Sequence, residues 1–280
     1  MKQLLLTLAV IATVPFTLVK NQIVVQTSVN GKGPYSFLVD TGVTPSVIDR
    51  AAAEAAGVAI DQSRSGEASG AGSGTMIVQR APIQELTLSG VSFRNLDALA
   101  ADLSRLSSRL GQPLHGILGD NFFAGRVVTI DYAAQRITIG RSLPPLPPGA
   151  IEMPFSTAND DVIPIIQDFE INGQKIPVSL DTGASLAVEL YPAAVERLGL
   201  AAVVEKAAGG SITGARGDAA VRKAKIDALT IGGMPLNDVE VTFSTRADHG
   251  AARMGNIGNA LMKNFVVTFD YTTRRVRLEK

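Results

Sequence analysis

The chain has 280 residues, and its 26 Lys and Arg balance its 26 Asp and Glu, so the formal net charge is zero. This balance, without any basic run, speaks against a nucleic-acid-binding protein, and the absence of cysteine excludes disulfides, thiol catalysis and cysteine-ligated zinc. The length suffices for two domains with separate cores, and because only 5% of the residues are aromatic, those cores must be mainly aliphatic.

The N-terminus is predicted to be a short secretory leader. Met1-Lys2 precedes an apolar run over residues 4–12 that ends in small residues, so we expect a signal peptide over residues 1–12 and an extracytoplasmic location, periplasmic or secreted. The alternative is an extra apolar strand packed on the first half of the chain. Pro15 interrupts the run, which is shorter than the ~20 residues that span a bilayer.

The first predicted strand pair leads into a short Asp-Thr-Gly segment. Residues 23–30 are rich in β-branched side chains, and residues 31–34 predict a turn. Residues 35–39 then return as a strand that ends at Asp40-Thr41-Gly42. Alone, such a segment is compatible with an ordinary strand-ending turn, in which Asp bonds the backbone and Gly takes positive φ.

Two short helices are predicted in the first half. Asp49 is a good N-cap for a helix over residues 50–56, with Gly57 as its end. The helical spacing of Leu103, Leu106 and Leu110 predicts a second, core-facing helix over residues 102–110.

Between these helices lies a Gly-rich stretch that includes Gly70, Gly72 and Gly74 and precedes a strand over residues 75–79. It has a superficial likeness to a dinucleotide-binding loop, but the third glycine of that fingerprint falls at Thr75. No apolar strand leads into the stretch and no helix follows it, so the sequence predicts a flexible hairpin tip.

The second half repeats the first. Asp181-Thr182-Gly183 again follows an apolar strand, and the segment that starts at Gly116 recurs without a gap 139 positions later, at Gly255. The Pro-rich residues 141–149 predict a stiff linker between the two copies, each of about 130 residues. The second copy also predicts a helix that starts at Pro192 and ends at Gly199, and a Gly-rich hairpin that contains Gly210 and Gly214.

This duplicated order, with an Asp-Thr-Gly segment, a Gly-rich hairpin and an apolar segment ending in Gly in each half, resembles the retropepsin-like aspartic proteases in their bacterial, single-chain, two-lobed form. The resemblance implies an all-β fold with short helices, in which two retropepsin-like β-barrel lobes are related by internal duplication. The lobes are expected over residues 13–140 and 150–280, on either side of the linker over residues 141–149. One departure stands out, because Asn256 replaces the first apolar residue of the second apolar segment.

The resemblance also assigns roles to residues. Each lobe is expected to give one aspartate to a catalytic pair, and these are Asp40 and Asp181. The hydroxyls of Thr41 and Thr182 are expected to bond across to the opposite loop. Gly42 and Gly183 are expected to let each loop turn tightly and the two backbones meet closely. Substrate-covering flaps are implied at Gly70, Gly72, Gly74, Gly210 and Gly214, although the second hairpin could equally be a plain surface hairpin.

Two carboxylates held about 3 Å apart share one proton, an effect for which the aspartic proteases are themselves the standard example. The ionised member can take a proton from water while the protonated member polarises the scissile carbonyl. We therefore expect a monomeric endopeptidase acting on peptides or unfolded proteins, without cofactor, metal or nucleic acid. The alternative is a peptide-binding module that has lost catalysis. His115 and His249 lack zinc-type spacing and are expected to be polar surface residues.

Overall fold

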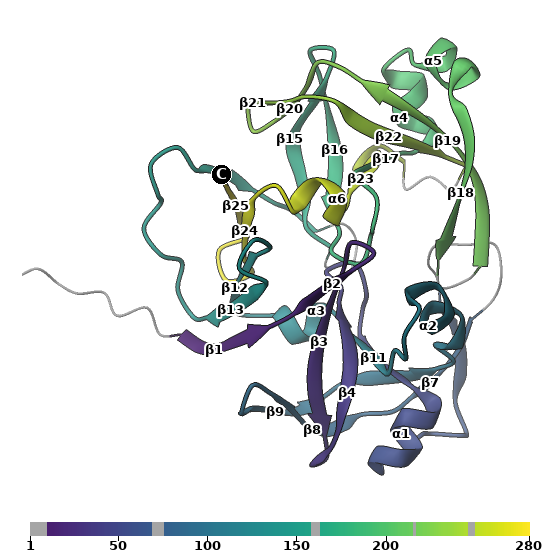
Figure 1. Ribbon diagram of the computed structural model, residues 1–280, viewed down its shortest axis with the longest axis vertical. Helices are drawn as coiled ribbons and strands as arrows, with labels where there is room; N and C mark the ends of the chain where they lie inside the picture. Colours follow the sequence, from purple (N-terminus) through teal and green to yellow (C-terminus); the bar gives the residue numbers. More distant parts are fainter. Residues whose placement is uncertain (1–9, 69–75, 158–162, 215–216, 246–249) are drawn as a thin grey trace, which may run out of the picture.

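The computed structural model describes residues 10–68, 76–157, 163–214, 217–245 and 250–280, which form three β-sheets with six short α-helices. Each half of the chain has a sheet of its own, and the third sheet is built by both halves (Figure 1). The predicted all-β, two-lobed, duplicated fold is therefore confirmed. No helix within these described residues is long and apolar enough to cross a membrane.

The two lobe sheets have the same strand order, position by position. In the first lobe the order is β6-β7-β10-β5-β11-β4-β3-β8-β9, with β2 added on β3, and in the second it is β18-β19-β22-β17-β23-β16-β15-β20-β21. The first-lobe strands are β2 Thr17–Val19, β3 Gln22–Val29, β4 Lys32–Val39, β5 Ser46–Asp49, β6 Ser65–Ala68, β7 Met76–Arg80, β8 Ile83–Leu88, β9 Val91–Leu96, β10 Ala98–Ala101 and β11 Gly116–Leu118. The second-lobe strands are β15 Ile165–Ile171, β16 Gln174–Leu180, β17 Val188–Leu190, β18 Ala208–Gly214, β19 Gly217–Ile226, β20 Leu229–Ile231, β21 Met234–Leu236, β22 Val239–Ser244 and β23 Gly255–Ile257.

The third sheet joins the lobes and has the order β1-β13-β12-β24-β25-β14. Its central pair is antiparallel and brings Thr129 opposite Thr268, with their hydroxyl oxygens 2.9 Å apart. The sequence did not predict this shared sheet, because pairing between equivalent strands of two copies leaves no pattern within either copy. Its strands are β1 Val10–Pro15, β12 Val127–Asp131, β13 Arg136–Gly140, β14 Ile151–Pro154, β24 Val266–Asp270 and β25 Arg275–Glu279.

The N-terminal segment pairs with this sheet. β1 lies antiparallel to β13, and Ala12 and Val14 are buried in the core. A mature chain that starts near Thr13 would therefore lack the first three residues of β1. Residues 1–9 lie outside the described residues, so the leader stays a prediction. The predicted linker, residues 141–149, forms no helix or strand and connects β13 to β14.

Three of the six helices in the described residues correspond to predicted ones. Helix α1 (Arg50–Ala56) begins after Asp49, whose carboxylate accepts the backbone N–H groups of Ala51 and Ala52, and ends at Gly57 with φ of 73°. Helix α2 (Ser104–Leu110) begins two residues later than predicted. Helix α4 (Pro192–Arg197) starts at Pro192 as predicted and ends two residues before Gly199. The remaining helices, α3 Asp120–Phe123, α5 Ala201–Lys206 and α6 Asn259–Met262, were not predicted.

The predicted turn over residues 31–34 is shorter than expected. Only Asn30 and Gly31 form the turn, with φ of 50° and 75°, and β4 begins at Lys32. Asn172 and Gly173 repeat the geometry in the second half, with φ of 51° and 79°. Positive φ at both central residues matches the right-handed twist of a two-residue hairpin, which explains the Asn-Gly pair in each copy.

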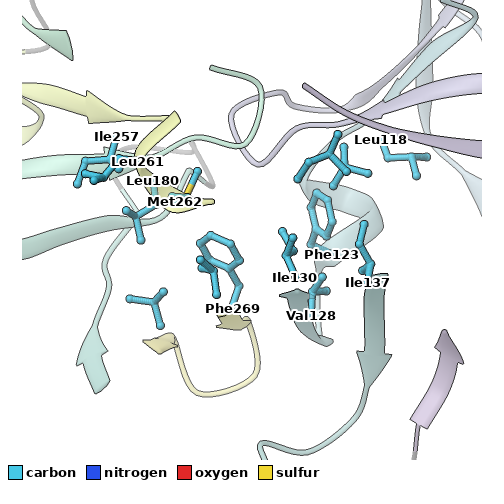
Figure 2. Close-up of a cluster of buried hydrophobic side chains, with 14 of the residues drawn as sticks. Leu118, Phe123, Val128, Ile130, Ile137, Leu180, Ile257, Leu261, Met262 and Phe269 are labelled. Carbon is cyan, nitrogen blue, oxygen red and sulfur yellow. The ribbon is translucent and has the colours of Figure 1, made fainter. Parts of the chain in front are cut away.

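A continuous apolar core lies between the shared sheet and the two lobes. Leu118, Phe123 and Ile130 of the first half have their counterparts in Ile257, Met262 and Phe269, each 139 positions later. Figure 2 shows the two sets facing each other from opposite sides of the lobe junction. The core thus repeats the internal duplication and supports the strands that lead into the two Asp-Thr-Gly segments.

Candidate active site

The two Asp-Thr-Gly segments have the same local geometry. β4 runs parallel to β11 and β16 runs parallel to β23, and an aspartate follows directly on each of the first strands. The backbone N–H of Asp40 donates to Leu118 O at 3.0 Å, and that of Asp181 donates to Ile257 O at 2.9 Å. Each loop is therefore fixed to the end of the apolar strand beside it.

Each aspartate also closes a turn in its own loop. Gly42 N donates to Asp40 Oδ1 at 2.7 Å, and Gly183 N donates to Asp181 Oδ1 at 2.8 Å. These bonds hold one oxygen of each carboxyl group toward its own backbone. The second oxygen of each group takes no part in this turn.

The two threonines bond reciprocally between the lobes. Thr41 Oγ1 donates to Leu180 O at 2.8 Å and accepts from Thr182 N at 3.0 Å. Thr182 Oγ1 donates to Val39 O at 2.8 Å and accepts from Thr41 N at 2.9 Å. Both side chains are buried, so all four bonds are shielded from water.

The glycines allow the loops to approach each other. A Cβ atom at Gly42 would lie 2.9 Å from Asp181 Oδ1, and a Cβ atom at Gly183 would overlap the Asp40 carboxylate. Neither glycine has positive φ, so a left-handed backbone is not what requires glycine in these turns. The close approach of the opposite carboxylate is what requires glycine at both positions.

Asp40 lies in surroundings that favour its protonated form. The pKa of Asp40 is raised well above its ordinary value, first because burial disfavours the charged form and second because Asp181 lies beside it. A side-chain hydrogen bond with Asp181 adds to the rise, whereas the N–H of Gly42 opposes it. Asp40 is therefore held in its protonated form over a wider pH range than a free aspartate.

Several contacts around the loops were not predicted from the sequence. Asn256 Nδ2 donates to Asp181 Oδ2 at 2.9 Å, Gln22 Nε2 donates to Gly183 O at 2.7 Å, and Asn259 Nδ2 donates to Thr182 O at 2.6 Å. Only Asn256 left a trace in the sequence, because it breaks the apolar pattern of its repeat. The other two could not be found without knowing which loops meet.

The predicted flap residues are only partly described. Gly70, Gly72 and Gly74 lie outside the described residues, between β6 and β7. Gly210 and Gly214 lie in β18, which pairs with β19 from Ala208 opposite Lys223 to Gly214 opposite Gly217. This hairpin runs down beside the first lobe toward α2 (Figure 1).

His115, the histidine within the described residues, lies outside the site. His115 is half-buried, and its Nδ1 accepts the backbone N–H of Ser36 at 3.0 Å, so it has a structural role rather than that of a free surface residue. His249 lies outside the described residues. Within the described part of the chain, no group of three or more His, Asp or Glu side chains is arranged to hold a metal ion.

Two comparisons with known proteins agree with this geometry. The crystal structure of aspartic proteinase from Irpex lacteus has the same fold, with a TM-score of 0.58 over 96% of this chain and 97% of that chain, at 14% identity. A family model described as aspartyl protease matches the chain twice, over residues 25–122 and 168–261. Among curated proteins, none matches the chain.

The fold is that of the two-lobed aspartic proteases. Because the family model covers more than half of the chain, the protein belongs to the aspartyl protease family. The predicted relationship to the retropepsin-like aspartic proteases is confirmed.

Proposed function

We propose that the protein is an aspartic endopeptidase that hydrolyses peptide bonds with a water molecule activated by Asp40 and Asp181. The observation that carries the proposal is the meeting of two Asp-Thr-Gly loops through the four hydrogen bonds of Thr41 and Thr182. Peptides or unfolded proteins are the proposed substrates. Because one chain supplies both aspartates, a monomer suffices.

The proposed reaction needs one proton on the pair. Asp181 takes a proton from water as the water oxygen attacks the scissile carbonyl carbon, and Asp40 gives its proton to the carbonyl oxygen. In the second step, the protonated Asp181 gives its proton to the leaving amine nitrogen. The C–N bond breaks while one hydroxyl of the intermediate returns a proton to Asp40. The pair ends as it began, and no covalent intermediate forms.

The test is replacement of each aspartate by asparagine. Asp40→Asn and Asp181→Asn should each abolish hydrolysis of an unfolded protein, because an amide can neither accept the proton of water nor supply an acidic proton. The double variant should lose no more activity than either single one, since the pair acts as a unit. Hydrolysis would be followed over several pH values, with a statine-type inhibitor as a control for the aspartic mechanism.

Two outcomes would contradict the proposal. Substantial activity in either single variant would mean that the two aspartates do not act as one pair. A wild-type protein that binds peptides but never cleaves them would instead be a peptide-binding module.

A further inference from the structure

The two lobes have the same strand arrangement but differ in one row of side chains that crosses the sheet beside the aspartates. The strand registers are the same in both lobes, running across β4, β11, β5 and β10 in the first and across β16, β23, β17 and β22 in the second. The first lobe carries the apolar row Leu38, Ile117, Val47 and Leu99, and the second carries the polar row Ser179, Asn256, Glu189 and Thr242.

Both rows are inside the protein. In the first lobe, Leu38, Ile117 and Val47 pack in an apolar cluster with neighbouring aliphatic side chains. In the second lobe, all four polar residues are exposed by 2% or less. Buried polar side chains are costly unless they are hydrogen-bonded, so a polar row at this place needs specific partners.

Asn256 is the member of the row that reaches the catalytic pair. Its Nδ2 donates to Asp181 Oδ2 at 2.9 Å, and its Oδ1 accepts from Ser179 Oγ, also at 2.9 Å. In this arrangement the amide nitrogen, which can only donate, faces Asp181, and the amide oxygen, which can only accept, faces the hydroxyl of Ser179. Ser179 thereby fixes the orientation of the amide.

The equivalent position beside Asp40 has no such donor. There the residue is Ile117, opposite Leu38, and neither side chain carries an N–H or O–H group. A hydrogen bond to an ionised carboxylate favours the ionised form. The two aspartates thus meet different surroundings although their loops are alike.

We propose that Asn256, held by Ser179, is a positioning residue that breaks the symmetry of the pair, keeping Asp181 ionised as the base and leaving the shared proton on Asp40. This inference rests on the proposed function, which it deepens by giving a structural reason for the roles of the two aspartates. The raised pKa of Asp40, which arises mainly from burial and from Asp181, agrees with a proton on that side.

Other titratable groups surround the pair and must be separated from the effect of Asn256. Glu189 stands opposite Asn256 on β17, and Arg109 donates to the hydroxyl of Ser185 in the loop after Asp181. On the side of Asp40, Tyr271 is half-buried and its hydroxyl oxygen is buried. Its pKa is raised, first by burial and then by the charges of Asp120 and Asp40. Among these groups, Glu189 lies in the same row as Asn256 and is the one to control for.

The test is the pH dependence of kcat/KM in an Asn256→Leu variant, which keeps the branched shape of the side chain and removes the donor. Without the donor the anion is less stable, so both protonation steps of the pair should move to higher pH, by about one unit. The variant should therefore lose about tenfold in activity on the acidic side while matching or exceeding the wild type on the alkaline side. KM near the optimum should change little.

Matched variants separate this effect from structural damage. Thr268→Val removes a buried hydrogen bond in the shared sheet and should leave the pH profile in place, whatever it costs in stability. Ser179→Ala keeps the donor Asn256 but no longer fixes the orientation of its amide. It should therefore move the pH profile in the same direction as Asn256→Leu, but by less. If Asn256→Leu does not fold, Ser179→Ala provides the test. Equal loss of activity at all pH values in both Asn256→Leu and Ser179→Ala would overturn the inference. The inference would also be overturned if the pH profile shifted in Glu189→Gln but not in Asn256→Leu.

A second measurement keeps this inference distinct from the proposed function. If the wild type cleaves no peptide, the proposed function fails, but the titration of Asp181 can still be followed by ¹³C NMR of its carboxyl carbon, assigned with Asp181→Asn. The carboxyl group should titrate at higher pH in Asn256→Leu than in the wild type. An unchanged titration would overturn the role of Asn256 even in a fully active enzyme.

Discussion

At the scale of single residues, the reciprocal threonine bonds predict a large and specific cost. Thr41→Val removes the oxygen that bonds Leu180 O and Thr182 N, so a buried carbonyl and a buried N–H lose their partners. Each such loss costs about 1–3 kcal/mol, and we expect the free energy of unfolding to fall by about 2–4 kcal/mol in total. Urea denaturation measures this change.

Thr41→Ser is the matched control, because serine keeps the oxygen and loses only a methyl group. It should retain most of the stability and activity. If Thr41→Val were as stable as Thr41→Ser, the bonds between the loops would not be holding the lobes together.

The same scale shows what a sequence can reveal about a site. Asp40 and Asp181 are visible because an unusual tripeptide occurs twice within a longer repeat. Asn256 is visible only as a break in an apolar pattern, and the pattern does not say what the amide touches. Gln22 gives no trace at all, since its partner, Gly183 O, belongs to a loop 161 positions away.

At the scale of elements, the hairpin of β18 and β19 predicts a change in substrate binding. Removing Ile212 and Thr213 together with their neighbours across the hairpin, Asp218 and Ala219, shortens both strands by two residues. The remaining side chains then stay on their original faces, because the period of a strand is two. If the hairpin covers substrate, KM should rise several-fold with the fold intact, as measured by peptide kinetics and circular dichroism.

A removal of the same size at the hairpin of β20 and β21 is the control, because that hairpin lies at the far edge of the second-lobe sheet. Unchanged kinetics after shortening β18 and β19 would mean that this hairpin is a plain surface feature. Loss of activity on removal of Gly70 to Gly74 alone would then indicate a single flap in the first lobe.

Elements set by residues close to them in the sequence were predictable, whereas those set by contacts between distant parts of the chain were not. Helix α1 follows from Asp49 and Gly57 at its two ends, which act within a few residues. The pairing of β12 with β24 depends on two strands that have nearly the same sequence and lie in different halves. Helix α5 has no side-chain cap, and its first residue follows Leu200, so its start carries no recognisable pattern.

At the scale of the whole molecule, the duplication in one chain makes asymmetry possible. A symmetric dimer of identical chains must place the same residue beside both aspartates, whereas a fused pair can place Ile117 beside one and Asn256 beside the other. The shared six-stranded sheet holds the halves together, so each can diverge without losing its partner. The polar row of the second lobe, which replaces the apolar row of the first, is an example of this divergence.

The free energy of unfolding should depend on pH because of the aspartate pair. Because the folded-state pKa of Asp40 is raised, the folded protein binds more protons than the unfolded chain at pH values above the ordinary aspartate value of 3.8. The contribution of Asp40 to stability is therefore fully present below that pH and is lost as the pH rises through the raised pKa. Asp40→Asn removes this loss. Between pH 3.8 and the raised pKa of Asp40, the free energy of unfolding of this variant should therefore increase relative to that of the wild type. The increase should be up to about 1.4 kcal/mol for each pH unit.

Asp270 provides a control of opposite sign. Its burial raises the pKa, but hydrogen bonds from the hydroxyls and N–H groups of Thr272 and Thr273 outweigh that effect and lower it. The contribution of Asp270 is thus present above the ordinary aspartate pKa and is lost as the pH falls, so Asp270→Asn should be least harmful in acid. Urea denaturation of the three proteins between pH 3 and pH 8 measures both slopes. A constant difference between Asp40→Asn and the wild type over this range would mean that Asp40 is not held protonated by burial and by Asp181.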